Sequence, residues 1–419
     1  MITSVAALAV AAALASEPEP PLFDDTPLVH ASPWRPSLRV AAIGRADLTV
    51  DGPRDNTMGG VIEVAGEVVY EPTPAWEARV KARARSLAEA RPGHAEGRFV
   101  PDLIDLALVW RPELGPEITL GVVGDLRWPT LVTPQPPDRS LGPLEGGGLL
   151  SAESTVTARP VPLLIVAQSL SDWRLQTLWQ PWFVPARWPL RRSGWAPIAD
   201  VLGVGDFAGV AGPAGLAGGS AGLRLSGRLG ELSLGATWLW RVEPIPDETT
   251  FGRQHRAGLD LGLTTGPLAW RFELAFADHE TAWTAAGSAT RGPALEALLI
   301  TSAQPLVMLE LEAGLRAVAF LDDVGDDMHF LERGPRDAEV LFRLGLLLAY
   351  DGVLRLDLRG RVALARADFD LAAALALRTS RKSEVALGLG VYDGNAVAVG
   401  RGALYDGDDE VWVRWTHAW

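Results

Sequence analysis

The sequence predicts an all-β fold, a transmembrane antiparallel up-and-down β-barrel of about eighteen strands, with about sixteen as the alternative. Three observations support this prediction. Apolar and polar residues alternate with a period of two along most of the chain, and long connections alternate with short ones. Beyond the N-terminal segment, no apolar run approaches the roughly 18 residues that a transmembrane helix needs. A chain of this kind crosses a membrane only as a closed barrel.

The lengths of the connections separate a barrel from a soluble β-sandwich, whose strands also alternate. Strands are predicted to begin near residues 38, 59, 75, 99, 117, 161, 173, 219, 231, 255, 268, 293, 306, 338, 353, 368, 384 and 410. Long connections such as 87–98, 129–160, 183–218 and 278–292 alternate with short ones such as 230 and 266–267, and only the turn near 366–368 breaks the rule. Short turns at one rim and long loops at the other are typical of outer-membrane barrels.

The N-terminal segment predicts export. An apolar run from Val5 to Leu14 ends in Ala13-Leu14-Ala15, the pattern of a signal h-region and its cleavage site, although no Lys or Arg precedes it. We therefore expect a signal peptide at 1–15, a periplasmic leader at 16–37, and a barrel at 38–419 with long loops at 129–160 and 183–218. The expected location is the outer membrane of a Gram-negative bacterium.

The C-terminus supports the same location. The last strand reads V-W-V-R-W-T-H-A-W, which places Trp415 and Trp419 on one apolar face and ends the chain on an aromatic residue. This pattern resembles the sorting signal that the bacterial barrel-assembly machinery recognises. The resemblance implies that machinery as a partner, with outer-membrane lipid and lipopolysaccharide around the barrel. The oligomeric state stays open.

A second motif lies in the middle of the chain. Trp179, Pro181, Phe183, Pro185 and Arg187 form the pattern W-x-P-x-F-x-P-x-R at the end of a predicted hairpin. With this motif, segments 124–143 and 159–195 resemble a group of proteobacterial outer-membrane porin-like proteins of undefined substrate. The family's preceding Trp-Gly and Asn-Pro elements are replaced here by Trp128-Pro129 and by residues 137–139. A more distant likeness is to alginate-export-type barrels, which implies eighteen strands and a basic lumen.

The alternation predicts which side chains line the barrel interior. Segment 77–86 reads E-A-R-V-K-A-R-A-R-S, so on a strand its cations share one face while small apolar residues share the other. We expect a lining of Arg79, Lys81, Arg83, Arg85, Glu63, Glu67, Arg127, Arg355, Asp357, Arg359 and Arg361. Rings of Arg or Lys select anions. The alternative is that carboxylates on neighbouring strands neutralise these cations and only stiffen the wall.

The two longest loops are candidates for a constriction, because long loops of porin-type barrels can fold into the lumen. The residues expected there are Trp182, Arg187, Trp188, Arg191 and Arg192. The alternative is an extracellular cap packed by its own aromatic side chains.

Other functional classes lack their sequence features. A net charge of −14 without a basic tail argues against nucleic-acid binding, and the absence of Cys excludes thiolate metal sites. No G-x-S-x-G, H-E-x-x-H or P-loop motif occurs, so we expect no enzyme activity. A barrel lipase would need a Ser and a His within hydrogen-bond reach on the outer wall. The acidic loops at 322–327 and 406–410 lack EF-hand spacing, so no metal and no cofactor are expected.

The sequence thus predicts a porin-like channel for the diffusion or facilitated transport of small polar or anionic solutes through an Arg-rich lumen. The alternative is a plugged barrel that acts as a structural or surface-interaction protein through its long loops.

Overall fold

The computed structural model describes residues 33–47, 58–91, 93–124, 144–145, 157–158, 160–184, 212–213, 215–243, 250–284, 289–322, 328–329, 336–348, 353–364, 368–393 and 409–419. These residues are almost entirely β-strand, with a short 3-10 helix at Gly215–Gly218. No helix among them is long and apolar enough to cross a membrane.

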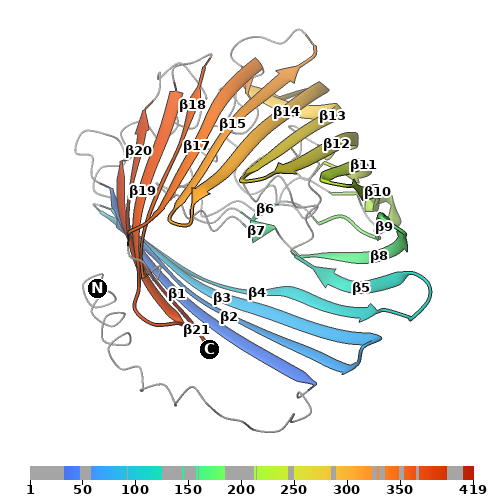
Figure 1. Ribbon diagram of the computed structural model, residues 1–419, viewed down its shortest axis with the longest axis horizontal. Helices are drawn as coiled ribbons and strands as arrows, with labels where there is room; N and C mark the ends of the chain where they lie inside the picture. Colours follow the sequence, from blue (N-terminus) through green and yellow to red (C-terminus); the bar gives the residue numbers. More distant parts are fainter. Residues whose placement is uncertain are drawn as a thin grey trace.

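Within the described residues, eighteen antiparallel strands form a closed barrel wall (Figure 1). They are β1 (Trp34–Asp47), β2 (Met58–Thr73), β3 (Trp76–Arg91), β4 (His94–Trp110), β5 (Glu117–Val123), β8 (Val161–Leu170), β9 (Trp173–Gln180), β10 (Ser220–Leu229), β11 (Leu232–Val242), β12 (Arg253–Thr265), β13 (Leu268–Thr284), β14 (Ala289–Leu306), β15 (Leu309–Phe320), β17 (Arg336–Leu347), β18 (Leu354–Ala363), β19 (Asp368–Arg378), β20 (Ser383–Asp393) and β21 (Glu410–Ala418).

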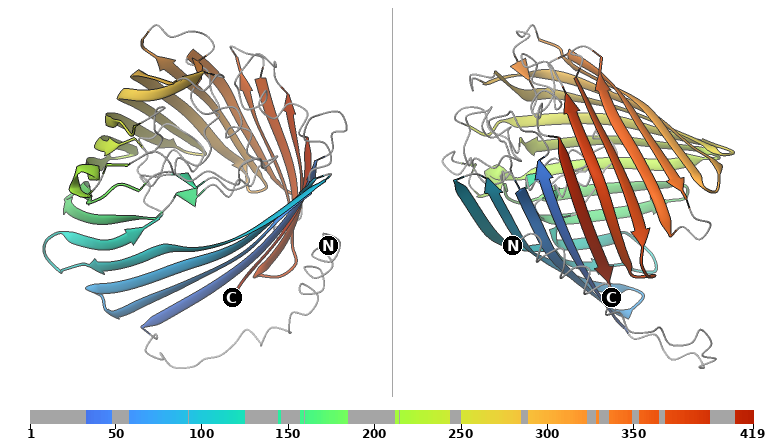
Figure 2. Two further views of the ribbon diagram at one scale, coloured as in Figure 1. Left: turned by 180° about the vertical axis from the view of Figure 1, so that it is seen from behind. Right: turned by 90° about the vertical axis from the view of Figure 1, so that its left-hand side faces the viewer.

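Each wall strand pairs with the next, and β1 pairs with both β2 and β21, which closes the ring. Figure 2 shows the strands running side by side at a tilt around the wall. A two-residue strand, β16 (Met328–His329), extends the end of β13, and β6 (Leu144–Glu145) pairs only with β7 (Thr157–Ala158). The prediction of eighteen strands is confirmed, and the sixteen-strand alternative is wrong.

Three predicted boundaries are wrong because strands run further than their apolar patterns. β1 begins at Trp34 rather than at residue 38, and β13 and β14 extend into the predicted loop 278–292. The predicted loop 87–98 is also strand, since β3 continues to Arg91 and β4 starts at His94. Gly93, with φ of 76°, lies in the tight turn between them. Beyond the apolar belt both faces of a strand are polar, so the alternation fades while backbone pairing continues.

Exposure separates the two faces of the wall. Side chains on the concave face of a closed barrel converge and cover one another, whereas those on the convex face diverge. Along β3, Trp76 and Val80 are each 42% exposed, while Arg83 is 7% and Arg85 only 2% exposed. On β3 the apolar side of the alternation therefore faces outward and the charged side faces inward.

Aromatic side chains gather near both rims of the outer face. Beside the short turns, Trp34 contacts Tyr70 in a tilted arrangement with ring centroids 4.2 Å apart, and Trp76 stacks on Trp110 at 6.0 Å. At the other end of their strands, Trp179 and Trp238 are 46% and 43% exposed. Two aromatic girdles that flank an apolar belt are the usual outer surface of a membrane barrel.

The last strand has the predicted alternation. Val413 and Trp419 are 45% and 55% exposed, whereas Trp412 is 1% exposed and points inward. The Trp415, His417 and Trp419 rings lie next to one another, with centroids of successive rings 6.1 and 4.0 Å apart. Trp412 lies against Gly388, where any added side chain would overlap the indole ring.

Candidate functional site

The inner wall is the candidate functional site, and its first component is the predicted set of cations on β3. We call Arg79, Lys81, Arg83 and Arg85 the β3 row. Arg79 lies 3.4 Å from Asp105 and 3.8 Å from Glu77, and Arg83 lies 3.8 Å from Glu63. Register places Lys81 opposite both Glu67 on β2 and Asp105 on β4. The predicted carboxylates Glu63 and Glu67 thus face the β3 row from the neighbouring strand.

The second component, the β18 row, consists of Arg355, Asp357, Arg359 and Arg361. Two of its cations, Arg355 and Arg361, are held closely by carboxylates. Arg361 donates to Glu339 at 2.8 Å and to Asp370 at 2.7 Å, and Asp368 lies 3.6 Å away. Arg355 donates to Asp357 at 2.9 Å. On this side of the barrel carboxylates of β17, β18 and β19 largely neutralise Arg355 and Arg361.

Further ion pairs on the inner face connect strands between β10 and β14. Arg224 on β10 donates to Asp260 on β12 at 2.7 Å and to Thr237 on the intervening β11 at 2.9 Å. Arg256 lies 3.4 Å from Glu280 and 3.5 Å from Glu296. Inward-facing charges could be identified from the alternation, but their partners depend on the register between strands. The inner wall is therefore mixed in charge rather than uniformly basic.

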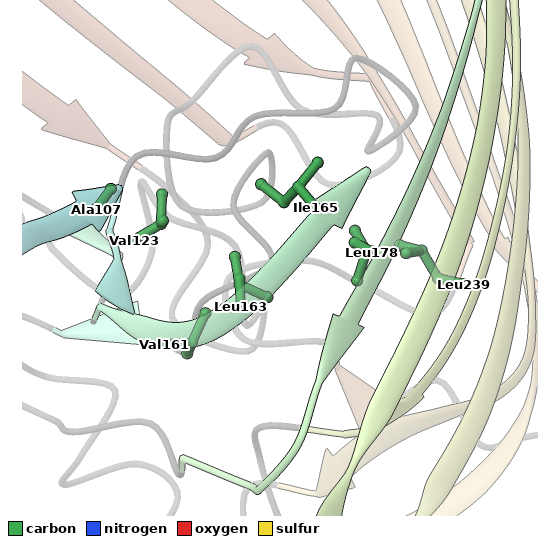
Figure 3. Close-up of a cluster of buried hydrophobic side chains, with 7 residues drawn as sticks. All are labelled: Ala107, Val123, Val161, Leu163, Ile165, Leu178 and Leu239. Atoms are coloured by element: carbon green, nitrogen blue, oxygen red, sulfur yellow. The ribbon is translucent and has the colours of Figure 1, made fainter. Parts of the chain in front are cut away.

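One sector of the inner face is apolar, which sequence analysis did not predict. We call Ala107, Val123, Val161, Leu163, Ile165, Leu178 and Leu239 the apolar patch (Figure 3). Val161 and Leu239 are each 1% exposed although they face the barrel interior. Burial this deep means that protein rather than water covers the patch, and among the described residues Val184 packs against it. The signal in the sequence was segment 161–167, V-P-L-L-I-V-A, which is apolar on both faces.

Several predicted site residues cannot be compared with the structure. Arg127 of the lining and Arg187, Trp188, Arg191 and Arg192 of the constriction lie outside the described residues. Trp182 is described, and its side chain is 53% exposed. Its carbonyl oxygen accepts a hydrogen bond from the Gln180 amide at 2.9 Å.

Beside the short turns, Arg111 connects two carboxylates. Its guanidinium donates to Glu77 at 2.8 Å and to Glu117 at 3.0 Å, and Arg174 also donates to Glu117. Burial disfavours the charged guanidinium, but hydrogen bonds and charge interactions with Glu77 and Glu117 outweigh burial and raise the pKa of Arg111. This network ties β3, β4, β5 and β9 together at that rim.

At the opposite rim, Glu243 follows β11 and is 4% exposed. It accepts hydrogen bonds from the Thr281 amide at 3.0 Å and the Thr281 hydroxyl at 2.7 Å. Burial and the nearby Glu280 raise the pKa of Glu243 to about 8, despite the opposing effects of Thr281 and Arg241. Arg291 also faces this carboxyl, at 3.8 Å.

This raised pKa predicts a pH dependence of stability. The folded protein retains the Glu243 proton up to about pH 8, whereas the unfolded chain loses it near 4.5. The stabilisation is therefore complete below the lower pKa and is lost as the pH rises through the higher one, by at most about 5 kcal/mol. We expect the urea unfolding midpoint of Glu243→Gln to change less between pH 5 and 8 than that of the unmodified protein. The exposed Glu113→Gln is the control and should keep the original pH dependence. An unchanged pH profile in Glu243→Gln would contradict this assignment.

The outer wall carries one Ser–His contact. Ser383 Oγ lies 2.5 Å from His417 Nδ1, which is the kind of pair that a barrel lipase would need. However, Ser383 is only 6% exposed, and His417 is flanked by Trp415 and Trp419 rather than by a carboxylate. The contact fastens β21 to β20 and does not present an accessible nucleophile. Among the described residues, no group of three His, Cys, Asp or Glu residues could hold a metal ion.

Comparison with solved structures identifies the fold. OccK8 (OprE) of Pseudomonas aeruginosa matches with a TM-score of 0.54 at 12% identity, over 92% of this chain and 98% of that one. OccK2 (OpdF) of the same organism, in complex with glucuronate, has a TM-score of 0.52 at 11% identity, over 92% and 97%. Salmonella typhi OmpF, in complex with daunomycin, has a TM-score of 0.50 at 11% identity over the same shares.

The sequence matches no protein-family model and no curated protein. At these levels of identity the structural likeness defines the fold alone. The chain is a porin-like β-barrel, the fold of channels in the Gram-negative outer membrane.

Proposed function

We propose that the protein is an outer-membrane channel through which small polar solutes diffuse. The observation that carries this proposal is the division of the closed wall into an apolar outer face and a charged inner face. A polar interior inside a lipid-facing wall provides a route for solutes that the bilayer excludes. The fold shared with OccK8, OccK2 and OmpF supports the same class of function.

The β3 side of the lumen is the proposed route for anions. The ion pairs of Arg79 with Asp105 and Glu77 measure 3.4 and 3.8 Å, whereas Arg361 on the β18 side donates at 2.7 and 2.8 Å. A cation that is further from its carboxylate partners is less neutralised, so it attracts anions in the lumen more strongly. Because the inner wall is mixed in charge, the expected anion preference is modest.

The apolar patch on the inner face supports the proposal that segments of the chain lie inside the lumen, because an apolar surface is more stable when protein rather than water covers it. Val123 and Val161, next to the connection 125–160, belong to the patch, and Val184, which precedes the connection 185–211, packs against it. We infer that the two longest loops narrow the pathway, with Arg187, Trp188, Arg191 and Arg192 beside it, and these four residues lie outside the described part of the chain. If these loops fill the lumen entirely, the protein is the plugged barrel of the alternative interpretation, which acts through its surface loops.

Export and assembly complete the proposal. Residues 1–15 would be removed as a signal peptide, and the face that carries Trp415 and Trp419 would be read by the barrel-assembly machinery. Acidic loops at the long-loop rim would bind lipopolysaccharide through divalent cations. Deleting the terminal Trp419 should then reduce insertion of the barrel into the outer membrane, which heat-modifiable gel mobility of membrane fractions would show. Normal insertion would contradict a role for this residue.

Reversal potential under a salt gradient tests the direction of the charge preference. The chain has only two lysines, Lys81 on the β3 row and Lys382 in the exposed β19–β20 turn, which form a matched pair. We expect Lys81→Gln to lower the anion-to-cation permeability ratio about two- to fivefold, because it removes one charge a few ångströms from passing ions. Lys382→Gln should leave the ratio unchanged. Equal ratios in all three proteins would contradict an anion route along β3.

A further inference from the structure

A pocket lies on the inner face near the short-turn rim, beside Arg355 and Asp357 of the β18 row. It has a volume of about 250 Å³, room for about eight water molecules. Its lining comes from the β12–β13 turn and from β13, β14, β15 and β17, and includes Ala269, Ser302, Glu312 and Arg343. Small side chains at Ala269 and Ser302 leave the space open.

The strand register arranges the polar lining in one row. Ser302 on β14 pairs directly with Glu312 on β15, and Glu312 pairs directly with Arg343 on β17. Directly paired residues on one face have Cβ atoms about 5 Å apart. The pocket therefore presents a hydroxyl, a carboxylate and a guanidinium side by side, in that order.

The Glu312 carboxylate interacts with Arg343 through its charge but forms no close ion pair with it. Arg343, its direct cross-strand neighbour, turns to Asp357, to which Nη2 donates at 2.7 Å and Nε at 3.1 Å. Among the described residues Glu312 makes no hydrogen bond or ion pair, and the Nη1 group of Arg343 donates to none of them. The second carboxylate of the lining, Glu310, is 55% exposed and lies 3.7 Å from Arg355.

These groups complement a small zwitterion. An ammonium group has three donors and no acceptor, and the Glu312 carboxylate and Ser302 hydroxyl can accept from it. A guanidinium held in place by Asp357 can still donate from Nη1 to a ligand carboxylate. The opposite charges are separated by about the distance between adjacent strands, which suits a short molecule that carries both groups.

We propose that this pocket binds a small zwitterionic solute with a primary ammonium group on Glu312 and a carboxylate on Arg343, as in a small amino acid. Only the biological role of the pocket, holding a solute in transit, rests on the proposed channel function. Binding itself is measured separately from conduction.

The test uses the mature barrel refolded in detergent micelles, with saturation-transfer NMR of three probes. Glycine carries both groups, ethylamine only the ammonium and acetate only the carboxylate. We expect glycine to bind in the millimolar range, ethylamine at least threefold more weakly, and acetate not to bind. Glu312→Gln should weaken glycine binding about tenfold or more, and Ser302→Ala about threefold. Glu113→Gln, in the exposed β4–β5 turn outside the pocket lining, should have no effect.

The outcomes separate this inference from the channel proposal. Absence of glycine binding, or equal binding in Glu312→Gln, would overturn the pocket assignment even if the barrel conducts. Ethylamine binding as tight as glycine binding would overturn the role of Arg343. A barrel that binds glycine with the expected dependence on Glu312 but does not conduct would support the pocket and contradict the channel. Heat-modifiable gel mobility confirms that each variant is folded.

Discussion

Replacing Arg361 by alanine is expected to destabilise the barrel by about 3–5 kcal/mol, the usual cost of removing one partner from a buried ion pair. Arg361 is 8% exposed, and its guanidinium lies between Glu339 at 2.8 Å, Asp370 at 2.7 Å and Asp368 at 3.6 Å. Glu339 and Asp368 are themselves 2% and 0% exposed. Without the guanidinium, three carboxylates from β17 and β19 repel one another in a poorly hydrated part of the wall.

Arg355 on the same strand provides the matched control. Its side chain is 38% exposed, and its partner Asp357 also accepts from Arg343. Arg355→Ala should therefore cost less than about 1 kcal/mol. Urea unfolding in lipid vesicles, followed by Trp fluorescence, measures both variants. Similar midpoints for Arg361→Ala and Arg355→Ala would contradict a structural role for the Arg361 cluster.

Gly121→Ala is expected to have the second large effect, a loss of about 3 kcal/mol or failure of β4 and β5 to pair. A Cβ at this position would lie 2.0 Å from the Leu106 carbonyl oxygen and 2.7 Å from the Ala107 Cα. Both atoms belong to the β4 backbone, so no side-chain rotation relieves the overlap. Gly121 pairs with Ala107 and Leu163, so the damage falls in the centre of the apolar patch.

Gly44→Ala on β1 is the control, because a Cβ there meets nothing within 4 Å. It should change the stability by less than about 1 kcal/mol, and in the stabilising direction, since alanine restricts the unfolded chain. The two proteins are compared by urea unfolding and by heat-modifiable gel mobility. A Gly121→Ala barrel as stable as Gly44→Ala would show that β4 and β5 have more room than the structure indicates.

The number of strands, and which face of each strand points outward, could be predicted from the alternation of apolar and polar residues. A single strand such as 77–86 reveals its two environments because only one face contacts lipid. The hairpin around Gly93 was missed because outside the apolar belt neither face contacts lipid, and hydrophobicity no longer reports the strand. The first residues of β1, from Trp34, were missed for the same reason.

The ion-pair partners of the inward-facing charges could not be predicted from the sequence for a different reason. Arg361 is recognisably inward, but whether Glu339 or another carboxylate neutralises it depends on a register fixed by the whole barrel. An Arg-rich sequence therefore overestimates how basic the lumen is. The apolar patch was detectable in principle, because a membrane strand that is apolar on both faces, such as 161–167, must have protein on its inner side.

An open pathway along the β3 row is tested most directly by single-channel recording during acetylation of Lys81. In a Lys382→Arg barrel, Lys81 is the only lysine. A water-soluble acetylating reagent should produce one discrete change in conductance and a shift of the reversal potential away from anion preference. Lys81→Arg/Lys382→Arg, which keeps both charges, should show neither. A folded barrel that carries no current, or whose current is unchanged after mass spectrometry shows Lys81 acetylated, would contradict the account.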